Sequence, residues 1–233
     1  MPTELARIAA EITSCTRCPR LVRCREAAAR EPPRRFVASP YWARPLPGFG
    51  DPRARLLVVG LAPAAHGANR TGRVFTGDRS GDWLYAALHR AGFANQPASV
   101  ARDDGLALRD AYVTTVVRCA PPANRPSPSE RDRCLRFLER ELVGLPRVRA
   151  IVALGAFAWD GTLRVLRELG HAAAPRPAFT HAASTRLGPY ALFGSYHVSQ
   201  QNTFTGRLTE PMLDAVFAAA RAALTEPPAT PRR

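Results

Sequence analysis

The stretch RLLVVGL at Arg55–Leu61 decides the fold, because it is a short run of apolar and β-branched residues without a polar face. Such a run is typical of a strand covered on both sides, as the strands of a parallel sheet are. Three similar runs follow along the chain: AYVTTVV at Ala111–Val117, RAIVAL at Arg149–Leu154 and LFGSYHV at Leu192–Val198. Together the four runs predict a central, mainly parallel, four-stranded sheet.

Helical patterns separate the predicted strands. Ser127 and Glu130 form a capping box at the start of a helix that runs from about Pro128 to Leu142. The other predicted helices span Asp82–Ala91, Ala156–Leu169 and Thr209–Leu224, and Pro40–Pro52 is expected to be a long ordered loop or an extended lead-in. Because strands and helices alternate, we expect a single three-layer α/β domain over residues 1–225 and a flexible tail over residues 226–233.

The charge of the chain points to a polyanionic partner. All 33 basic side chains are arginines, and 19 acidic side chains leave a net charge of +14. This balance predicts a nucleic acid as the first choice of partner and an acidic membrane as the second. The absence of lysine excludes mechanisms that need a lysine Schiff base or a phosphate-loop lysine.

The sequence shows no sign of export or membrane insertion. No apolar run approaches the ~20 residues that a membrane-spanning helix needs. The N-terminal segment carries Glu4 and Glu11 and lacks the apolar core of a signal peptide. We therefore expect a cytoplasmic protein without a membrane partner.

Three polar loops follow predicted strands and should meet at one edge of the sheet. They read GLAPAAHGANRTGRVFTGDRSGDW from Gly60, RCAPPANRPSPSE from Arg118 and HVSQQNTFTGRLT from His197. In open parallel sheets the ligand crevice lies outside the carboxyl ends of the strands. The sequence therefore predicts the functional site where these loops converge.

Four of the five cysteines form two pairs that can hold a metal centre. Cys15 and Cys18 make a C-x-x-C, and Cys119 and Cys134 lie at the end of a predicted strand and on the following helix. Four thiolates can surround zinc or a [4Fe–4S] cluster, and the wide second pair favours the cluster over zinc. Free thiols remain the third alternative. Cys24 fits no ligand spacing and is expected to be a half-buried helix residue.

The three loop motifs and the four-cysteine pattern together resemble the type B branch, or family five, of the uracil-DNA glycosylase superfamily. The resemblance runs from about Cys15 to Pro211. It implies a four-stranded parallel sheet between helices and a structural iron–sulfur cluster. We also expect the protein to be a monomer. The implied activity is the monofunctional hydrolytic excision of uracil, and often of other deaminated bases, from DNA.

The resemblance suggests roles for residues of the first and third loops. An enzyme that excises a base flips it into a pocket, and Phe75 is the expected stacking surface, with a core position as the alternative. Asp78 is the expected catalytic carboxylate, near the sugar cation or the attacking water, although it can equally cap the following helix. His197 is expected to donate to the base carbonyl. His66 is a weaker candidate for water activation.

Further residues are assigned to the base pocket and to DNA. Gly60, Thr115 and Asn124 are assigned to the base pocket, with a simple turn as the alternative for Asn124. The segment Gln200–Arg207 resembles an intercalation loop, and phosphate or groove contacts are expected from Asn69, Arg70, Arg73, Gln201, Asn202 and Arg207.

Two departures from relatives in the superfamily bear on specificity. The first motif has only Ala62, Pro63, Ala64 and Ala65 where several relatives carry a polar or acidic side chain. Thr115 stands where relatives that read uracil tightly place an asparagine, and a threonine cannot make a bidentate amide contact. We therefore expect excision of uracil together with hypoxanthine and xanthine. The rival interpretation is a non-catalytic DNA-binding protein stapled by a cluster or by zinc.

Overall fold

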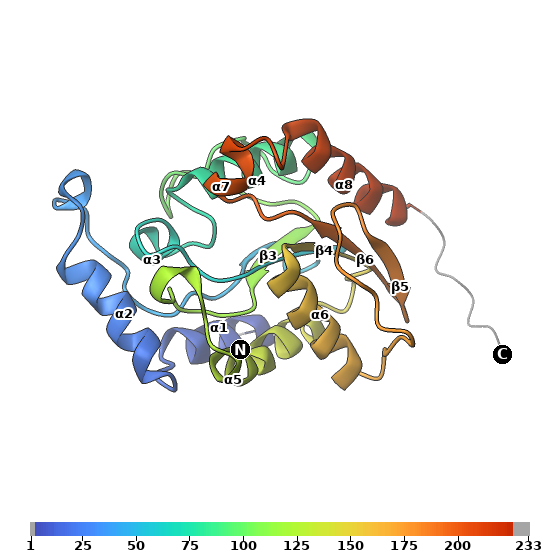
Figure 1. The fold of residues 1–233 in the computed structure, drawn as a ribbon, viewed down its shortest axis with the longest axis horizontal. Coiled ribbons are helices and arrows are strands. Elements are labelled where there is room, and N and C mark those ends of the chain that lie inside the picture. The colour runs from blue at the N-terminus through green and yellow to red at the C-terminus, as the bar shows by residue number, and fades with distance from the viewer. Residues whose placement is uncertain (1–2, 226–233) are drawn as a thin grey trace.

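The computed structural model describes residues 3–225, which fold into a six-stranded sheet between two layers of helices (Figure 1). The strand order is β1-β3-β2-β4-β6-β5. The four inner strands run parallel and are β2 (Leu56–Gly60), β3 (Ala111–Thr115), β4 (Ala150–Leu154) and β6 (Tyr190–Ser195). They match the four apolar runs, so the predicted α/β class with a mainly parallel sheet is confirmed.

The predicted number of strands is wrong, because two antiparallel edge strands complete the sheet. β1 (Phe49–Gly50) pairs with β3 inside the expected extended lead-in, and β5 (Ser184–Leu187) pairs with β6. β5 reads Ser-Thr-Arg-Leu and is largely exposed, so it lacks the apolar run of a covered strand. β6 ends at Ser195, opposite the last residue of β4, three residues before the predicted end. The predicted tail, residues 226–233, lies outside the described residues.

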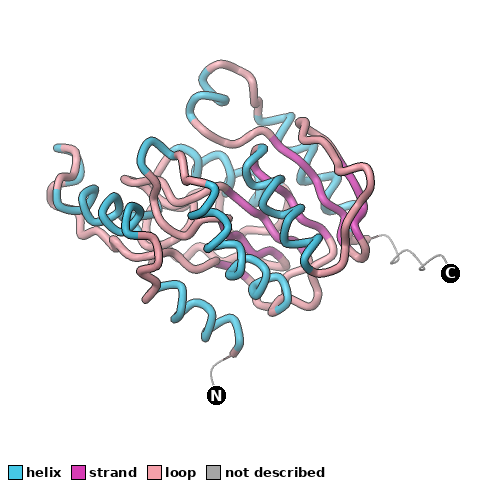
Figure 2. Tube along the Cα trace, turned by 60° about the horizontal axis from the view of Figure 1, so that its bottom comes forward, coloured by secondary structure: helices cyan, strands magenta, loops and turns pink. Residues whose placement is uncertain are grey.

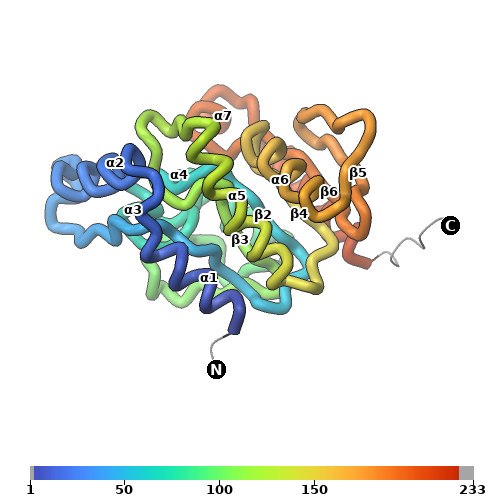
Figure 3. Tube along the Cα trace, turned by 90° about the horizontal axis from the view of Figure 1, so that it is seen from below, coloured from blue at the N-terminus to red at the C-terminus, as the bar shows by residue number. Residues whose placement is uncertain are grey.

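Helices cover both faces of the sheet, whose strands lie side by side in Figure 2. α4 (Arg79–Arg90) and α8 (Glu210–Ala223) pack on the core that contains Val58. α5 (Pro128–Val143) and α6 (Ala156–Glu168) pack on the core that contains Val59, and Figure 3 shows these two helices in front of the sheet. Successive strand residues point to opposite faces, which is why both faces must be covered.

The N-terminal helices lie on the α5 side of the molecule. α1 (Glu4–Thr13) packs on α5 through Ile8 and Ile12, and α2 (Pro19–Arg30) precedes a short helix, η1 (Arg34–Phe36). The predicted capping box is confirmed: the Ser127 hydroxyl accepts from Glu130 N–H, and the Glu130 carboxylate accepts from Ser127 N–H. Among residues 3–225, no helix is long and apolar enough to cross a membrane.

Candidate active site

A cleft of about 570 Å³ lies at the carboxyl ends of the inner strands. Its walls come from the loop after β2, which contains α3 (Ala68–Thr71), from η2 (Pro122–Asn124) after β3, and from α7 (Gln200–Phe204) after β6. The predicted convergence of the three loops is thus confirmed. The cleft brings together six of the predicted site residues: Phe75, Asp78, Thr115, Asn124, His197 and Gln201.

Phe75 lines the cleft with an apolar ring. Its φ of 52° lies in the left-handed region, so the surrounding loop must hold a backbone shape that favours glycine. Its ring lies directly against Gly60, where any added Cβ would overlap the ring. Gly60 is not among the described residues that line the cleft, so its assignment to the base pocket is corrected to a support for Phe75.

Asp78 is fixed in the wall of the cleft by the start of α4. Its Oδ1 accepts a hydrogen bond from Gly81 N–H at 3.1 Å, so the helix begins at Arg79, three residues earlier than predicted. The carboxylate lies against Gly67, where a Cβ would overlap it. Burial raises the pKa of the Asp78 carboxyl, while hydrogen bonds from Gly81 and Ser80 oppose this shift. The helix-cap role is therefore present, and it fixes the position of a carboxylate with a raised pKa in the cleft.

His197 faces Phe75 from the third loop. The two ring centroids lie 6.2 Å apart with a tilt of 35°. Burial lowers the pKa of His197 to about 4, so the imidazole is neutral at physiological pH. A neutral imidazole carries one N–H donor and one acceptor nitrogen. Within residues 3–225 no group hydrogen-bonds to either ring nitrogen, which leaves both available to a ligand.

Thr115 and Asn124 line the cleft from the second strand and the loop after it. The Thr115 hydroxyl donates to the Val117 carbonyl at 2.9 Å, so this hydroxyl can offer only its lone pairs to a ligand. Asn124 is exposed at the rim, with a φ of 55° that follows the left-handed Ala123. Both residues therefore lie at the cleft, and their contact with a base stays a prediction.

Three of the residues predicted to contact DNA instead bind other residues of the protein. Arg73 is buried and pairs with Asp104 at 2.7 Å, and Asn69 is buried with its amide donating to the carbonyls of Arg25 and Ala65. Neither can reach a phosphate, so both assignments are wrong. The Asn202 amide donates to the His197 carbonyl at 2.8 Å and thereby fixes the loop that carries the imidazole.

Arg70 is partly available to DNA. Its guanidinium donates to the carbonyls of His66 and Gly77, which leaves only part of its donor capacity for a phosphate. The remaining predicted contacts, Gln201 and Arg207, are exposed, and the Arg207 guanidinium stacks 4.6 Å from the centre of the Tyr196 ring.

Sequence reasoning missed Arg79 beside the cleft and named Phe204 only as part of the segment Gln200–Arg207. Arg79 lines the cleft, and its guanidinium lies 4.5 Å from the centre of the Phe204 ring on α7. Phe204 is 65% exposed, which is unusual for an aromatic side chain. The only signal available in the sequence was an aromatic residue inside a polar loop.

These features have counterparts in known proteins. Residues 47–221 match the family described as the Uracil DNA glycosylase superfamily. The chain belongs to this superfamily. The Type-5 uracil-DNA glycosylase of Mycobacterium tuberculosis is 54% identical over 221 residues, which cover 94% of this chain and 81% of the relative. The Type-5 uracil-DNA glycosylase of Thermus thermophilus is 51% identical over 213 residues, covering 90% of this chain and 94% of the relative.

Likeness to the type four branch is weaker. The Type-4 uracil-DNA glycosylase of Archaeoglobus fulgidus is 36% identical over 114 residues, which cover 48% of this chain and 49% of the relative. The resemblance to family five of the uracil-DNA glycosylases is therefore confirmed. The matched family region contains the whole cleft and begins after Cys15 and Cys18.

The cysteine corner, formed by Cys15, Cys18, Cys119 and Cys134, lies beyond the end of β3. Cys18, Cys119 and Cys134 are buried in the same core, and Cys15 is partly buried. Burial, with smaller contributions from the nearby thiols of Cys134 and Cys15, raises the pKa of Cys119 to about 12 against the opposing effect of Arg25. Within residues 3–225, no three His, Cys, Asp or Glu side chains are grouped closely enough to hold a single metal ion.

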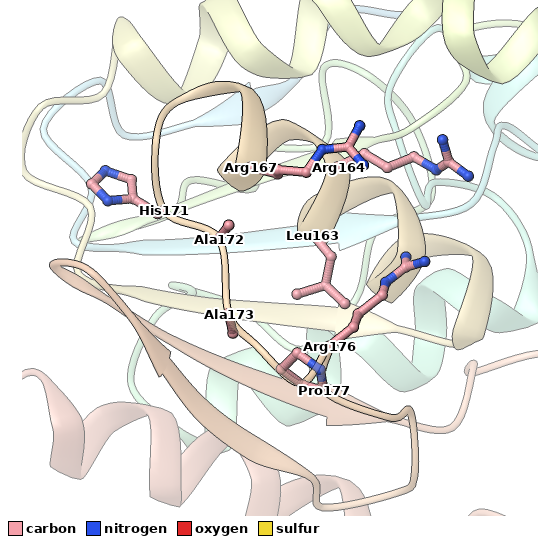
Figure 4. A pocket seen from close by; sticks show the side chains of 8 residues that line it. All are labelled: Leu163, Arg164, Arg167, His171, Ala172, Ala173, Arg176 and Pro177. Carbon is pink, nitrogen blue, oxygen red and sulfur yellow. The ribbon is translucent and has the colours of Figure 1, made fainter.

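A second, smaller cavity of about 210 Å³ lies beside α6 and the loop that follows it (Figure 4). Its arginines are already paired: Arg164 and Arg176 bond to Asp160, and Arg167 bonds to Glu168. The large cleft, in contrast, holds a carboxyl with a raised pKa and a neutral imidazole. Perturbed groups that converge in a cleft mark the better candidate for catalysis.

Proposed function

We propose that the protein hydrolytically excises uracil and other deaminated bases, hypoxanthine and xanthine among them, from DNA and leaves an abasic site. The observation that carries the proposal is the arrangement of Phe75, Asp78 and His197 around one cleft. Members of the superfamily at about half identity are named uracil-DNA glycosylases, which supports the uracil activity. The wider base range rests on the residues of this chain.

The cleft residues divide the chemistry of glycosidic cleavage among them. A flipped base stacks on the Phe75 ring, because a base inside the duplex is out of reach. Cleavage leaves negative charge on the departing base, and the N–H of the neutral His197 imidazole donates a hydrogen bond to the base oxygen that gains charge. The Asp78 carboxylate stabilises the sugar cation and orients the water that attacks it.

The polar groups that would select uracil alone are few. Ala62 and Ala64 line the cleft where a polar side chain would read or exclude a base, and the Thr115 hydroxyl proton is held by Val117. A site without a fixed amide loses little when a purine replaces a pyrimidine. These features support a pocket that accepts several deaminated bases.

We further propose that Cys15, Cys18, Cys119 and Cys134 hold a [4Fe–4S] cluster, which staples the N-terminal helices to β3 and α5. Arg25 supports this: its side chain is buried, its Nε has no partner among the described residues, and its Nη1 lies 3.4 Å from the Cys119 sulfur. Its other partners are the Cys15 carbonyl at 3.3 Å and the Glu26 carboxylate at 3.8 Å, and thiolates bound to a metal centre would give this buried cation a closer anion.

We also propose that the protein acts as a monomer. The function is tested by incubating the purified protein with duplexes that each carry one uracil, hypoxanthine, xanthine or thymine, followed by alkaline cleavage at abasic sites. We expect strand cleavage with the three deaminated bases and none with thymine. Tight DNA binding without any cleavage would establish the non-catalytic alternative instead.

A further inference from the structure

The segment between α2 and β1, residues 31–44, forms an arm that lies before the region matched to the superfamily. It reads EPPRRFVASPYWAR and contains η1. In Figure 1 the arm extends beyond α2 at the left of the molecule, on the side where α3 lies. Nothing in the proposed chemistry uses this segment.

The arm is attached to the loop that builds the active site. Trp42 N–H donates to the Arg70 carbonyl at 3.0 Å, and Ala43 N–H donates to the Asn69 carbonyl at 3.1 Å. The Tyr41 hydroxyl and the His66 Nδ1 are 2.9 Å apart. This same loop continues to Phe75 and Asp78, so a DNA strand that leaves the cleft along it meets the arm next.

Two aromatic rings of the arm, Phe36 and Trp42, hold nearby arginines in place. The guanidinium carbons of Arg35 and Arg70 lie 4.8 Å and 4.1 Å from the centre of the Phe36 ring. Trp42 is approached by Arg44 at 5.7 Å and by Arg102 at 4.6 Å. Stacking on a ring fixes the plane of a guanidinium without using its N–H groups, which remain free to bind an anion.

The exposed arginines of this surface lack acidic partners. Within residues 3–225, no carboxylate forms an ion pair or hydrogen bond with the arm surface, defined as Arg34, Arg35, Arg44 and Arg102. The arginines beside α6, in contrast, are paired with Asp160 or Glu168. The positive charge of these arginines also affects His66. Burial lowers the pKa of this imidazole, and the charges of Arg35 and Arg70 lower it further.

We propose that the arm surface binds phosphates of the DNA strand beyond the flipped nucleotide and so extends the DNA contact of the active site. The proposal rests on the proposed function for the identity of the polyanion. Four exposed guanidiniums without a carboxylate partner, three of them stacked on Phe36 or Trp42, match the paired non-bridging oxygens of phosphodiesters. An anionic lipid surface offers the same phosphate chemistry, but the attachment of the arm to the active-site loop favours DNA.

The test compares Arg34→Ala/Arg35→Ala with Arg147→Ala/Arg167→Ala. Both double variants remove the same charge from exposed side chains. Arg147 precedes β4 and Arg167 lies in the last turn of α6, so the control pair lies toward the amino ends of the strands, away from the cleft at their carboxyl ends. Dissociation constants are measured by fluorescence anisotropy across a range of salt concentrations, on a duplex with an uncleavable abasic-site analogue and on vesicles of phosphatidylserine and phosphatidylcholine.

We expect the arm variant to lower the slope of log K against log salt by about 2, because each phosphate contact contributes roughly one unit. The control should keep the wild-type slope, and kcat on saturating uracil-containing DNA should stay at the wild-type value for both. Equal slopes for the arm variant and the control would overturn the proposal. The proposal would also be overturned if the wild type bound vesicles more tightly than DNA and the arm variant lost the vesicle binding. If the wild type excises no base and the arm variant still shows a smaller slope of log K against log salt than the control, the proposed function fails while the arm proposal stands.

Discussion

The base cleft and the cysteine corner lie at the two ends of one short segment, from Thr115 to Cys119, and they are built in opposite ways. In the cleft, the His197 imidazole and the Asn124 amide face space that a ligand can enter. In the corner, Cys119 and Cys134 are buried, and the Arg25 guanidinium is buried beside them. A site that exchanges substrate and product must stay open, whereas a structural metal centre is closed. Under the proposed function, the residues of the cleft carry out the chemistry and the residues of the cysteine corner stabilise the fold.

The two regions are also connected. The buried Asn69 of the cleft loop donates its amide N–H to the Arg25 carbonyl on α2 at 3.1 Å. Loss of the corner should therefore loosen the loop that carries Asp78, whereas loss of Asp78 should leave the corner intact. The predictions below test this asymmetry.

The largest effect is expected from Cys119→Ala. Removal of one buried ligand should abolish the broad absorbance near ~400 nm that thiolate-ligated iron gives. It should also lower the free energy of unfolding by about 4 kcal/mol or more, since loss of a metal centre is among the most severe single changes. Absorbance spectra and urea unfolding measure both. Cys24→Ala is the matched control and should keep the colour, whereas colour retained in Cys119→Ala would refute the ligand assignment.

Asp78→Asn should impair catalysis in the cleft and leave the cysteine corner unchanged. The amide keeps the shape of the side chain and its hydrogen bond from Gly81, but it carries no charge to stabilise the sugar cation. We expect single-turnover uracil excision to fall about 100-fold or more, with the unfolding midpoint and the colour unchanged. DNA affinity should be equal or slightly higher. Excision at the wild-type rate would leave Asp78 with only its helix-cap role.

Thr115→Asn should sharpen the base selectivity of the cleft. An asparagine amide can pair with N3–H and O4 of uracil together. The Thr115 hydroxyl cannot do so, because it donates its proton to the Val117 carbonyl. The ratio of uracil to hypoxanthine excision should rise by about 10- to 100-fold, as a bidentate base contact is worth ~1–3 kcal/mol. The ratio is measured on paired duplexes at one salt concentration. An unchanged ratio would show that Thr115 does not contact the base.

The smallest effect is a shift in the acid limb of the pH profile. Burial raises the pKa of Asp78, so its carboxylate is protonated at a higher pH than an ordinary aspartic acid, whose pKa is about 3.9. Excision that needs the carboxylate should therefore fall as the pH drops through this raised value. Single-turnover rates in Asp78→Asn should lack this loss. An acid limb shared by both proteins would assign it to another group.

The sequence itself determined the inner sheet and the helices around it. The four apolar runs became the four parallel strands, and Ser127 with Glu130 capped α5, because burial and capping depend on residues close together in the chain. The convergence of Phe75, Asp78 and His197 also followed, since parallel strands bring their carboxyl ends to one edge. The edge strand β5 escaped prediction because it is exposed and carries no apolar pattern.

Only the tertiary structure decided which polar residues of these loops are free. Asn69 and Arg73 lie in the same loop as Asp78 and looked equally available, yet Arg25, about forty residues earlier, and Asp104, about thirty residues later, bury them. The same holds for Gly60, whose role depends on a ring fifteen positions away. A buried polar group must be paired, and its partner is chosen by the packing of distant segments rather than by its neighbours in the sequence.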